Sequence, residues 1–390
     1  MKNVAIPVRL GALFLESMVL TCFLCGTADA ARPDPVLKYR PYFAAGTCGD
    51  QDAVAIRAFD RAGNAFFLTV NPHTLNVSVN PAGSCNLETS SWASLYEKYA
   101  DTPYIRALIK AKSRASALQD AGIVHGFPQE RGVTLTVDLC PSRKGLDRAL
   151  FNGLVAELSK RERPVPVSLS ITGKFLRAHP DDIRWLRSRV ESGDLAVTWV
   201  NHTYNHRYDP KKPLARNFLL SPGTDVRGEV LQLETALLEQ EFSPSVFFRF
   251  PGLVSDGRLV SDIIAYGLVP LGADAWLAKG EQALDGSIVL IHGNGNEPLG
   301  VKDLFKLLKK EEPEVLKGKW RLYELSETVR KSVASASPDT AQSAPDNLYF
   351  LRRDTLTAVP RKTEMPVREH LFWTFPDASL DAEATDALHR

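Results

Sequence analysis

The sequence predicts an α/β fold built around a parallel sheet or barrel. From Val133 onward, short β-branched or apolar segments alternate with longer segments whose apolar residues have helical spacing. Side chains capable of acid–base or metal chemistry follow directly after several of the short segments. Functional sites in parallel α/β folds lie at the carboxyl ends of the strands, so this placement supports the same fold class.

Seven strands are expected in this part of the chain. The first covers residues 133–139, where β-branched residues alternate with others; the rest are 165–171, 195–200, 245–250, 268–272, 287–291 and 321–325. Between or after them, apolar residues at helical spacing predict helices at 145–161, 181–192, 224–240, 256–266 and 301–310. Strands that alternate with helices favour parallel pairing.

The two ends of the chain differ from this middle region. Lys2 and Arg9, a short apolar run and the small residues Ala28 and Ala30 are typical of a signal peptide over residues 1–30, with an uncleaved anchor as the alternative. The chain is therefore expected to be exported, to the periplasm or outside the cell, without a transmembrane span in its mature form. Residues 329–390 are expected to form a linker and a poorly ordered tail, because residues 331–346 read KSVASASPDTAQSAPD.

Residues 31–130 are expected to form a β-rich region, with short strands at 53–59, 65–70 and 74–79 and a helix over 94–118. Cys48 and Cys85 both lie in glycine-rich, turn-like segments. In an exported protein two of the three mature cysteines can pair, and we favour Cys48 with Cys85, leaving Cys140 free.

The overall charge argues against one class of partner. The 390 residues include 47 Lys and Arg against 46 Asp and Glu, a net charge of +1. Nucleic-acid-binding proteins usually carry a basic excess, so no nucleic-acid partner is expected. Near-neutral charge is compatible with an uncharged sugar substrate.

Residues after the strands suggest a metal-assisted hydrolytic site. His202 and His206 are four apart, so one helical turn would bring both rings to a common point, and such a pair suits zinc or a similar divalent ion. Asp138 lies amid apolar neighbours, where a buried carboxylate needs a charge partner. Arg249 can be that partner and can keep Asp138 charged, so that Asp138 acts as a general base. A structural ion pair is the alternative.

Three further positions complete the predicted site. His292 is suited to donate a proton, with Asp274 holding its ring, although a core histidine bonded to backbone is the alternative. The N–H of Gly252 can stabilise an oxyanion. Trp276 can line a sugar-sized groove, or simply belong to the core.

Together these segments resemble the five ordered motifs of polysaccharide deacetylases, the NodB-type group also called carbohydrate esterase family 4. The segments are 134–142 (TLTVDLCPS), 201–206 (NHTYNH), 249–252 (RFPG), 274–276 (DAW) and 290–292 (LIH), and the similarity covers residues 131–327. The resemblance implies a distorted (β/α) barrel over residues 131–328. It also implies metal-dependent removal of acetyl groups from a polysaccharide or from peptidoglycan.

The resemblance also assigns roles to individual residues. Asp138 matches the family's catalytic base, Arg249 the arginine that orients it, and His292 the general acid. His202 and His206 match the two metal-binding histidines. Asp274 corresponds to the partner of the acid, within a fourth motif that is shortened here together with Trp276.

One departure from the family affects the metal site. The family has a second aspartate as a metal ligand where this chain has Leu139, and glycine where it has Cys140. Three solutions are open: Asp138 becomes the ligand, Cys140 supplies a thiolate, or metal binds weakly or not at all. A secreted deacetylase is the leading hypothesis. A non-catalytic carbohydrate-binding protein and a metal hydrolase of another amide are the alternatives.

Overall fold

The computed structural model describes residues 34–115, 117–126 and 131–334. The expected signal peptide at residues 1–30 and the tail from residue 335 onward lie outside these ranges, so both stay predictions. Among the described helices, none has the length and apolar content that a membrane crossing requires.

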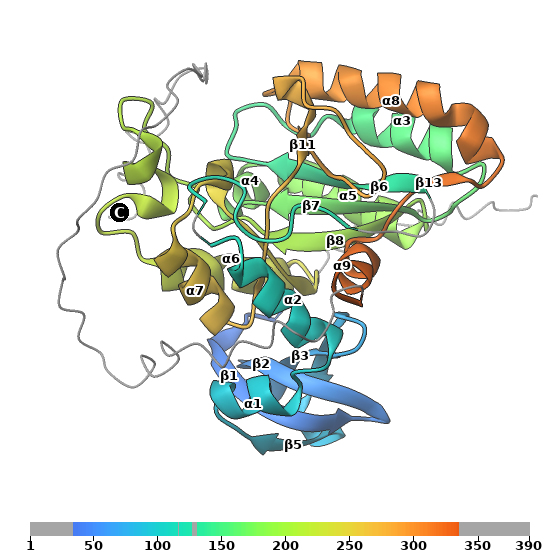
Figure 1. The fold of residues 1–390 in the computed structure, drawn as a ribbon. Coiled ribbons are helices and arrows are strands. Elements are labelled where there is room, and N and C mark those ends of the chain that lie inside the picture. Colours follow the sequence, from blue (N-terminus) through green and yellow to red (C-terminus); the bar gives the residue numbers. More distant parts are fainter. Residues whose placement is uncertain (1–33, 116, 127–130, 335–390) are drawn as a thin grey trace, which may run out of the picture. The chain divides into compact units, whose positions relative to one another are not determined.

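A parallel eight-stranded sheet forms the centre of the described residues (Figure 1). Its order is β10-β9-β8-β7-β6-β12-β11, with β13 pairing to β6, and every pairing is parallel. The strands are β6 (Arg131–Leu139), β7 (Val165–Ile171), β8 (Leu195–Asn201), β9 (Pro244–Arg249), β10 (Val269–Leu271), β11 (Ala275–Trp276), β12 (Ile288–His292) and β13 (Trp320–Leu322). Six predicted strands are confirmed and the seventh, predicted over 321–325, is confirmed in part, because β13 ends at Leu322 and Leu325 begins a helix. The two-residue β11 is an addition.

A short extended segment bridges the two sides of this curled sheet. Ile123 forms a parallel bridge with Leu271 on β10, and His125 forms an antiparallel bridge with Ser287 beside β12. Backbone bonds from Ile123 to Pro270 and from Ile288 to Val124 reinforce the bridges. The predicted distorted barrel therefore exists, and residues outside the alternating region help to close it.

Helices pack around the sheet and begin at recognisable N-terminal signals. They are α3 (Arg148–Leu158), α4 (Gly173–Ala178), α5 (Pro180–Glu191), α6 (Val226–Glu239), α7 (Gly257–Ala265), α8 (Pro298–Leu316) and α9 (Leu325–Ala334). Asp147, Thr172, Asp225 and Asp256 accept backbone N–H bonds as N-caps of α3, α4, α6 and α7. The five predicted helices are confirmed, whereas α4 and α9 were not predicted. Figure 1 shows α3 and α8 side by side.

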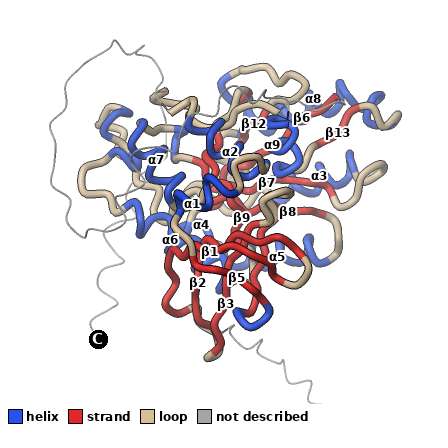
Figure 2. Tube along the Cα trace, turned by 60° about the horizontal axis from the view of Figure 1, so that its bottom comes forward, coloured by secondary structure: helices blue, strands red, loops and turns tan. Residues whose placement is uncertain are grey.

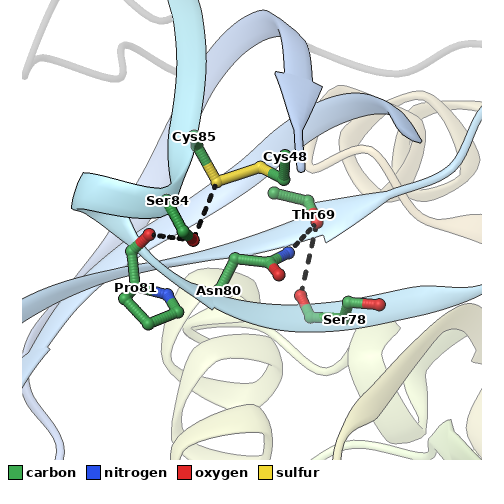
Figure 3. Close-up of a disulfide and its surroundings, with 7 residues drawn as sticks. All are labelled: Cys48, Thr69, Ser78, Asn80, Pro81, Ser84 and Cys85. Carbon is green, nitrogen blue, oxygen red and sulfur yellow. Dashed lines mark hydrogen bonds between the residues drawn. A yellow bond between two sulfur atoms is a disulfide. The ribbon is translucent and has the colours of Figure 1, made fainter. Parts of the chain in front are cut away.

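The N-terminal region forms a separate antiparallel sheet, of order β4-β3-β2-β1-β5 (Figure 2). Its strands are β1 (Leu37–Cys48), β2 (Gln51–Arg61), β3 (Asn64–Val70), β4 (Val77–Pro81) and β5 (Cys85–Thr89). The β-rich prediction is confirmed, with β1 and β5 as additions. Cys48 and Cys85 lie opposite each other on β1 and β5 and form the expected disulfide, while Cys140 is free and buried (Figure 3).

The single helix predicted over residues 94–118 is wrong. Two helices occupy the region, α1 (Trp92–Lys98) and α2 (Pro103–Lys112). Pro103 explains the break, because proline has no N–H to continue a helix but fits a first turn, and Thr102 before it is extended.

A buried ion pair joins the N-terminal sheet to the barrel. Arg57 on β2 bonds through Nε and Nη2 to the two carboxylate oxygens of Glu234 on α6, at 2.7 and 2.9 Å, and both side chains are essentially inaccessible. Tyr39 donates a further bond to Glu234. Apolar residues of β2, α2, α7, β9, β10 and α9 also share one hydrophobic cluster. The two regions therefore share a core.

Candidate active site

A pocket at the carboxyl end of the central sheet collects most of the predicted site. Its lining residues come from several strand ends and loops: Asp138, Cys140, His202, His206, Phe218, Gly252, Leu253, Trp276, Leu290 and His292. Of the nine predicted site residues, Arg249 and Asp274 do not line it. The pocket forms because parallel strands end at the same edge of the sheet.

Three buried side chains in the pocket form a group suited to a metal ion. The ligand atoms of Cys140, His202 and His206 lie within 4.8 Å of one another. The Cys140 sulfur is 3.6 Å from His202 Nε2 and 3.5 Å from His206 Nε2. A sulfur about 2.3 Å and a nitrogen about 2.05 Å from one tetrahedral zinc ion would be about 3.6 Å apart. The donor set and its spacing therefore fit zinc.

The position of Leu139 explains why Cys140 belongs to this group. Leu139 is fully buried in the hydrophobic cluster of the sheet and its covering helices. Successive side chains along a strand point to opposite faces of the sheet. Asp138 and Cys140 therefore point to one face, and Leu139 points to the other. Among the three solutions left open by the sequence, this geometry supports Cys140 as the third ligand.

The two histidines converge by a different route from the one predicted. They do not share a helical turn, because residues 202–209 form loop and bends without helix. Thr203 and His206 adopt left-handed backbone angles, with φ of 69° and 49°, which bring the two ring centroids to 4.8 Å. His202 Nδ1 donates to the carbonyl oxygen of Arg249 at 2.9 Å, which orients the ring so that Nε2 faces the Cys140 sulfur.

Helix α6 holds the loop that carries these histidines. The buried carboxylate of Glu229 accepts bonds from the backbone N–H of Asn205 at 2.7 Å and from its side-chain amide at 3.0 Å. The N–H of Tyr204 donates to the carbonyl of Glu229, and the amide of Asn201 donates to that of Val230. Sequence reasoning missed Glu229, because a glutamate in a helix carries no signal of the loop that it faces.

Asp138 is paired as predicted. Arg249 Nη1 lies 3.1 Å from Asp138 Oδ1, and both side chains are buried. Arg249 is itself fixed by Thr136 Oγ1 at 2.6 Å and the carbonyl of Gly272 at 2.9 Å. Burial alone would raise the pKa of Asp138, but the charges of Arg249, His202 and His292 outweigh it and leave the pKa below its ordinary value.

The predicted pairing of His292 with Asp274 is wrong. Asp274 instead bonds to His125 Nδ1 at 2.5 Å and accepts the N–H of Ile288. His292 Nδ1 is bonded to Glu297 at 2.8 Å. The loop after β12 brings Glu297 within hydrogen-bond distance of the His292 ring nitrogen, whereas His125 binds Asp274.

The charge states of Cys140 and His292 are coupled. Burial alone would lower the pKa of His292, but the negative charges of Cys140 and Glu297 outweigh it and hold the pKa well above its usual value. Burial alone would raise the pKa of the Cys140 thiol, yet His206 and His292 bring it well below its usual value. The geometry thus favours a thiolate beside an imidazolium.

Gly252 and Trp276 shape the remaining walls. Gly252 has a φ of 61°, and a Cβ there would come within 2.5 Å of the Phe218 ring, so glycine is required on both counts. Trp276 lies 5.9 Å from the His292 ring and donates its indole N–H to Glu297 at 2.8 Å. Glu297 therefore holds both the histidine and the tryptophan.

Comparison with known proteins returned no matching family model. The structures found to be similar include carbohydrate esterases of family 4, at low identity. A family 4 carbohydrate esterase from Bacillus anthracis has 16% identity and a TM-score of 0.41, and the match covers 60% of this chain and 92% of that one. A family 4 esterase from Bacillus subtilis has 14% identity and a TM-score of 0.39, with 55% and 93% covered.

Another similar structure is a family 4 pseudoenzyme from Bacillus anthracis. It has 14% identity and a TM-score of 0.38, and the match covers 55% of this chain and 70% of that one.

Proposed function

We propose that this protein is an exported, metal-dependent deacetylase that removes N-acetyl groups from a polysaccharide or from peptidoglycan. One observation carries the proposal. The cluster of Cys140, His202 and His206 shares a pocket with Asp138 and with His292. These residues would act as metal ligands, a charged base and a charged acid within one site, a combination suited to metal-assisted hydrolysis of an amide.

Cys140, His202 and His206 would hold the divalent ion, for which zinc is the best match. Imidazole and thiolate are both zinc ligands, and a tetrahedral ion held by three protein ligands keeps one position open, as in catalytic sites. When bound, such an ion supplies Lewis acidity, which polarises a carbonyl oxygen and acidifies water. The bond from His202 Nδ1 to the Arg249 carbonyl orients one ligand.

The residues around this cluster would carry out the proton transfers. A water molecule attacks the acetyl carbonyl carbon through its oxygen. Asp138, kept charged by Arg249, takes a proton from this water molecule as the new carbon–oxygen bond forms. The backbone N–H of Gly252 stabilises the resulting oxyanion. His292, kept protonated by Glu297, gives its proton to the amide nitrogen as the carbon–nitrogen bond breaks. Acetate and a free sugar amine are the products.

The apolar part of the pocket supports an acetyl substrate. Leu253, Trp276, Leu290 and Phe218 line it beside the charged groups. A methyl group can contact these side chains while the carbonyl oxygen faces the polar side. We therefore favour an acetamide over the other amides left open by the sequence.

Metal content and acetate release test this proposal together. The purified chain should contain about one zinc ion per molecule and release acetate from N-acetylglucosamine oligomers or from peptidoglycan. Asp138→Asn and His292→Ala should abolish acetate release while zinc content stays the same. Cys140→Ala should lose zinc as well.

Two results would point elsewhere. Absence of metal and turnover with retained glycan binding would favour the non-catalytic carbohydrate-binding alternative. Zinc without acetate release, but with hydrolysis of another amide, would favour the third hypothesis.

A further inference from the structure

A loop beside the pocket carries a concentration of positive charge. Residues 207–217 contain four basic residues, Arg207, Lys211, Lys212 and Arg216, and a single acidic residue, Asp209. The loop therefore has a net charge of +3. The whole chain has a net charge of only +1. All four basic side chains are exposed. The charge is therefore a local feature that the overall composition hides.

Both ends of the loop belong to the pocket. His206, directly before Arg207, and Phe218, two residues after Arg216, line it. Their rings meet edge to face with centroids 5.5 Å apart, and Tyr208 stacks on Phe218 at 5.1 Å. The loop therefore leaves the wall of the pocket after His206 and returns to it at Phe218, so its exposed basic residues lie between two lining residues in the chain.

The loop is held closed at its base. The side-chain oxygen of buried Asn217 accepts the N–H of Asp209 at 2.9 Å, and its amide donates to the carbonyl of Asp209 at 2.6 Å. The Asp209 carboxylate accepts a hydrogen bond from the backbone N–H of Lys211 at 3.0 Å and forms an ion pair with Lys212 Nζ at 3.3 Å. Within the described part of the chain, Asp209 forms its ion pair with Lys212, and Arg207 and Arg216 form none. One carboxylate cannot neutralise four cations, so the loop keeps a net positive charge.

We propose that the substrate is an anionic N-acetylated glycan, whose carboxylate groups contact Arg207, Lys211 and Arg216 next to the pocket. This inference rests on the proposed deacetylase function and specifies its substrate class. Lysine and arginine bind carboxylates through charge-assisted hydrogen bonds, and a local positive field raises the concentration of an anionic substrate near the site. It replaces the uncharged sugar that the near-neutral composition suggested.

Binding by the Asp138→Asn protein tests the proposal without depending on turnover. The neutral probe is a chitin tetrasaccharide. The anionic probes are a peptide-free tetrasaccharide of N-acetylglucosamine and N-acetylmuramic acid and a hyaluronan tetrasaccharide. The first carries its carboxylate on an acetylated sugar, and the second on the neighbouring sugar. We expect at least one anionic probe to bind about tenfold tighter than the neutral probe at low salt, and the preference to shrink as salt is added.

A charge-matched pair of variants separates the loop from the overall charge. Arg207→Gln, Lys211→Gln and Arg216→Gln combined should remove the anionic preference and leave binding of the chitin probe unchanged. Lys98→Gln, Lys309→Gln and Lys319→Gln combined change the net charge equally, on exposed residues outside the loop, and should keep the preference. Equal binding of neutral and anionic probes, or a preference that survives in the loop variant, overturns the inference. Acetate release from the chitin probe by the unmodified protein reports separately on the proposed function.

Discussion

Glu297 and His292 are bonded to each other across the turn after β12, with 2.8 Å between the carboxylate oxygen and Nδ1. The same carboxylate oxygen accepts the indole N–H of Trp276 at 2.8 Å. The contact with His292 stabilises the imidazolium, because a neighbouring negative charge favours the protonated form. Glu297 therefore takes the role that the sequence analysis assigned to Asp274.

Glu297→Gln should narrow the pH range of acetate release on the alkaline side. In the proposed mechanism a protonated His292 donates the proton, so activity should be lost as pH rises through its pKa. The negative charges of Cys140 and Glu297 outweigh burial and hold that pKa well above the usual value. Removing one of these charges lowers the pKa, so the alkaline limb should move to lower pH. A pH profile of kcat/KM measures the shift. Asp274→Asn serves as the control and should leave the limb in place, since Asp274 does not contact His292; movement in both variants would contradict the assignment.

Leu139→Asp introduces the carboxylate found at this position in the family that the sequence resembles. This substitution should destabilise the fold without strengthening metal binding. Leu139 is fully buried in an apolar cluster on the opposite face of β6 from Cys140. An unpaired carboxylate there should reduce the free energy of unfolding by about 3–5 kcal/mol, measured by urea denaturation. Leu139→Met conserves the side-chain volume and should reduce the free energy of unfolding by less than about 1.5 kcal/mol. Tighter zinc binding in Leu139→Asp would show that the side chain can reach the site.

Glu229→Gln should weaken metal binding although Glu229 is not itself a ligand. Its carboxylate fixes both the N–H and the side-chain amide of Asn205, one residue before His206. Loss of such support costs about 10- to 100-fold in metal affinity in comparable sites. Competition with a chelator measures the affinity. Asn205→Ala and the double variant complete a cycle, in which the two losses should be less than additive; strict additivity would argue that Glu229 acts elsewhere.

Arg57→Met should destabilise the whole chain and not only the N-terminal sheet. It leaves Glu234 charged and buried on α6, and breaking such a pair costs about 3–5 kcal/mol. The double variant Arg57→Met with Glu234→Leu should recover most of this loss, because no charge is left unpaired. Unfolding followed by tryptophan fluorescence gives both values. A second, earlier transition in the single variant would show instead that the N-terminal sheet unfolds independently.

Much of the fold could be predicted from local sequence because its signals are local. Alternation along residues 133–139 and helical spacing along residues 145–161 both correspond to elements of the structure. The closure of the barrel by Ile123 and His125 could not be predicted in this way, since isolated bridges need no periodic pattern. The partition of residues 94–118 into two helices had a signal in Pro103 that the apolar spacing obscured.

The candidate site divides in the same way. Asp138, Arg249, His202, His206 and His292 could be identified because each lies at or shortly after the carboxyl end of a strand, and parallel strands end together. The shared face of Asp138 and Cys140 also had a signal, in the period of two along β6. Glu297 and Glu229 had none, because their contacts depend on the path of a loop in space.

The sequence by itself determined the order of strands and helices, the cysteine pair of the N-terminal sheet and most of the residues that line the pocket. Only the tertiary structure decided that Cys140 approaches both histidines, that Glu297 and not Asp274 holds His292, and that a basic loop begins and ends at the wall of the pocket. The physical reason is one of range. Periodicity and turn signals act over a few residues, whereas ligand sets and ion pairs depend on distances between atoms that backbone torsions far apart in the chain bring together.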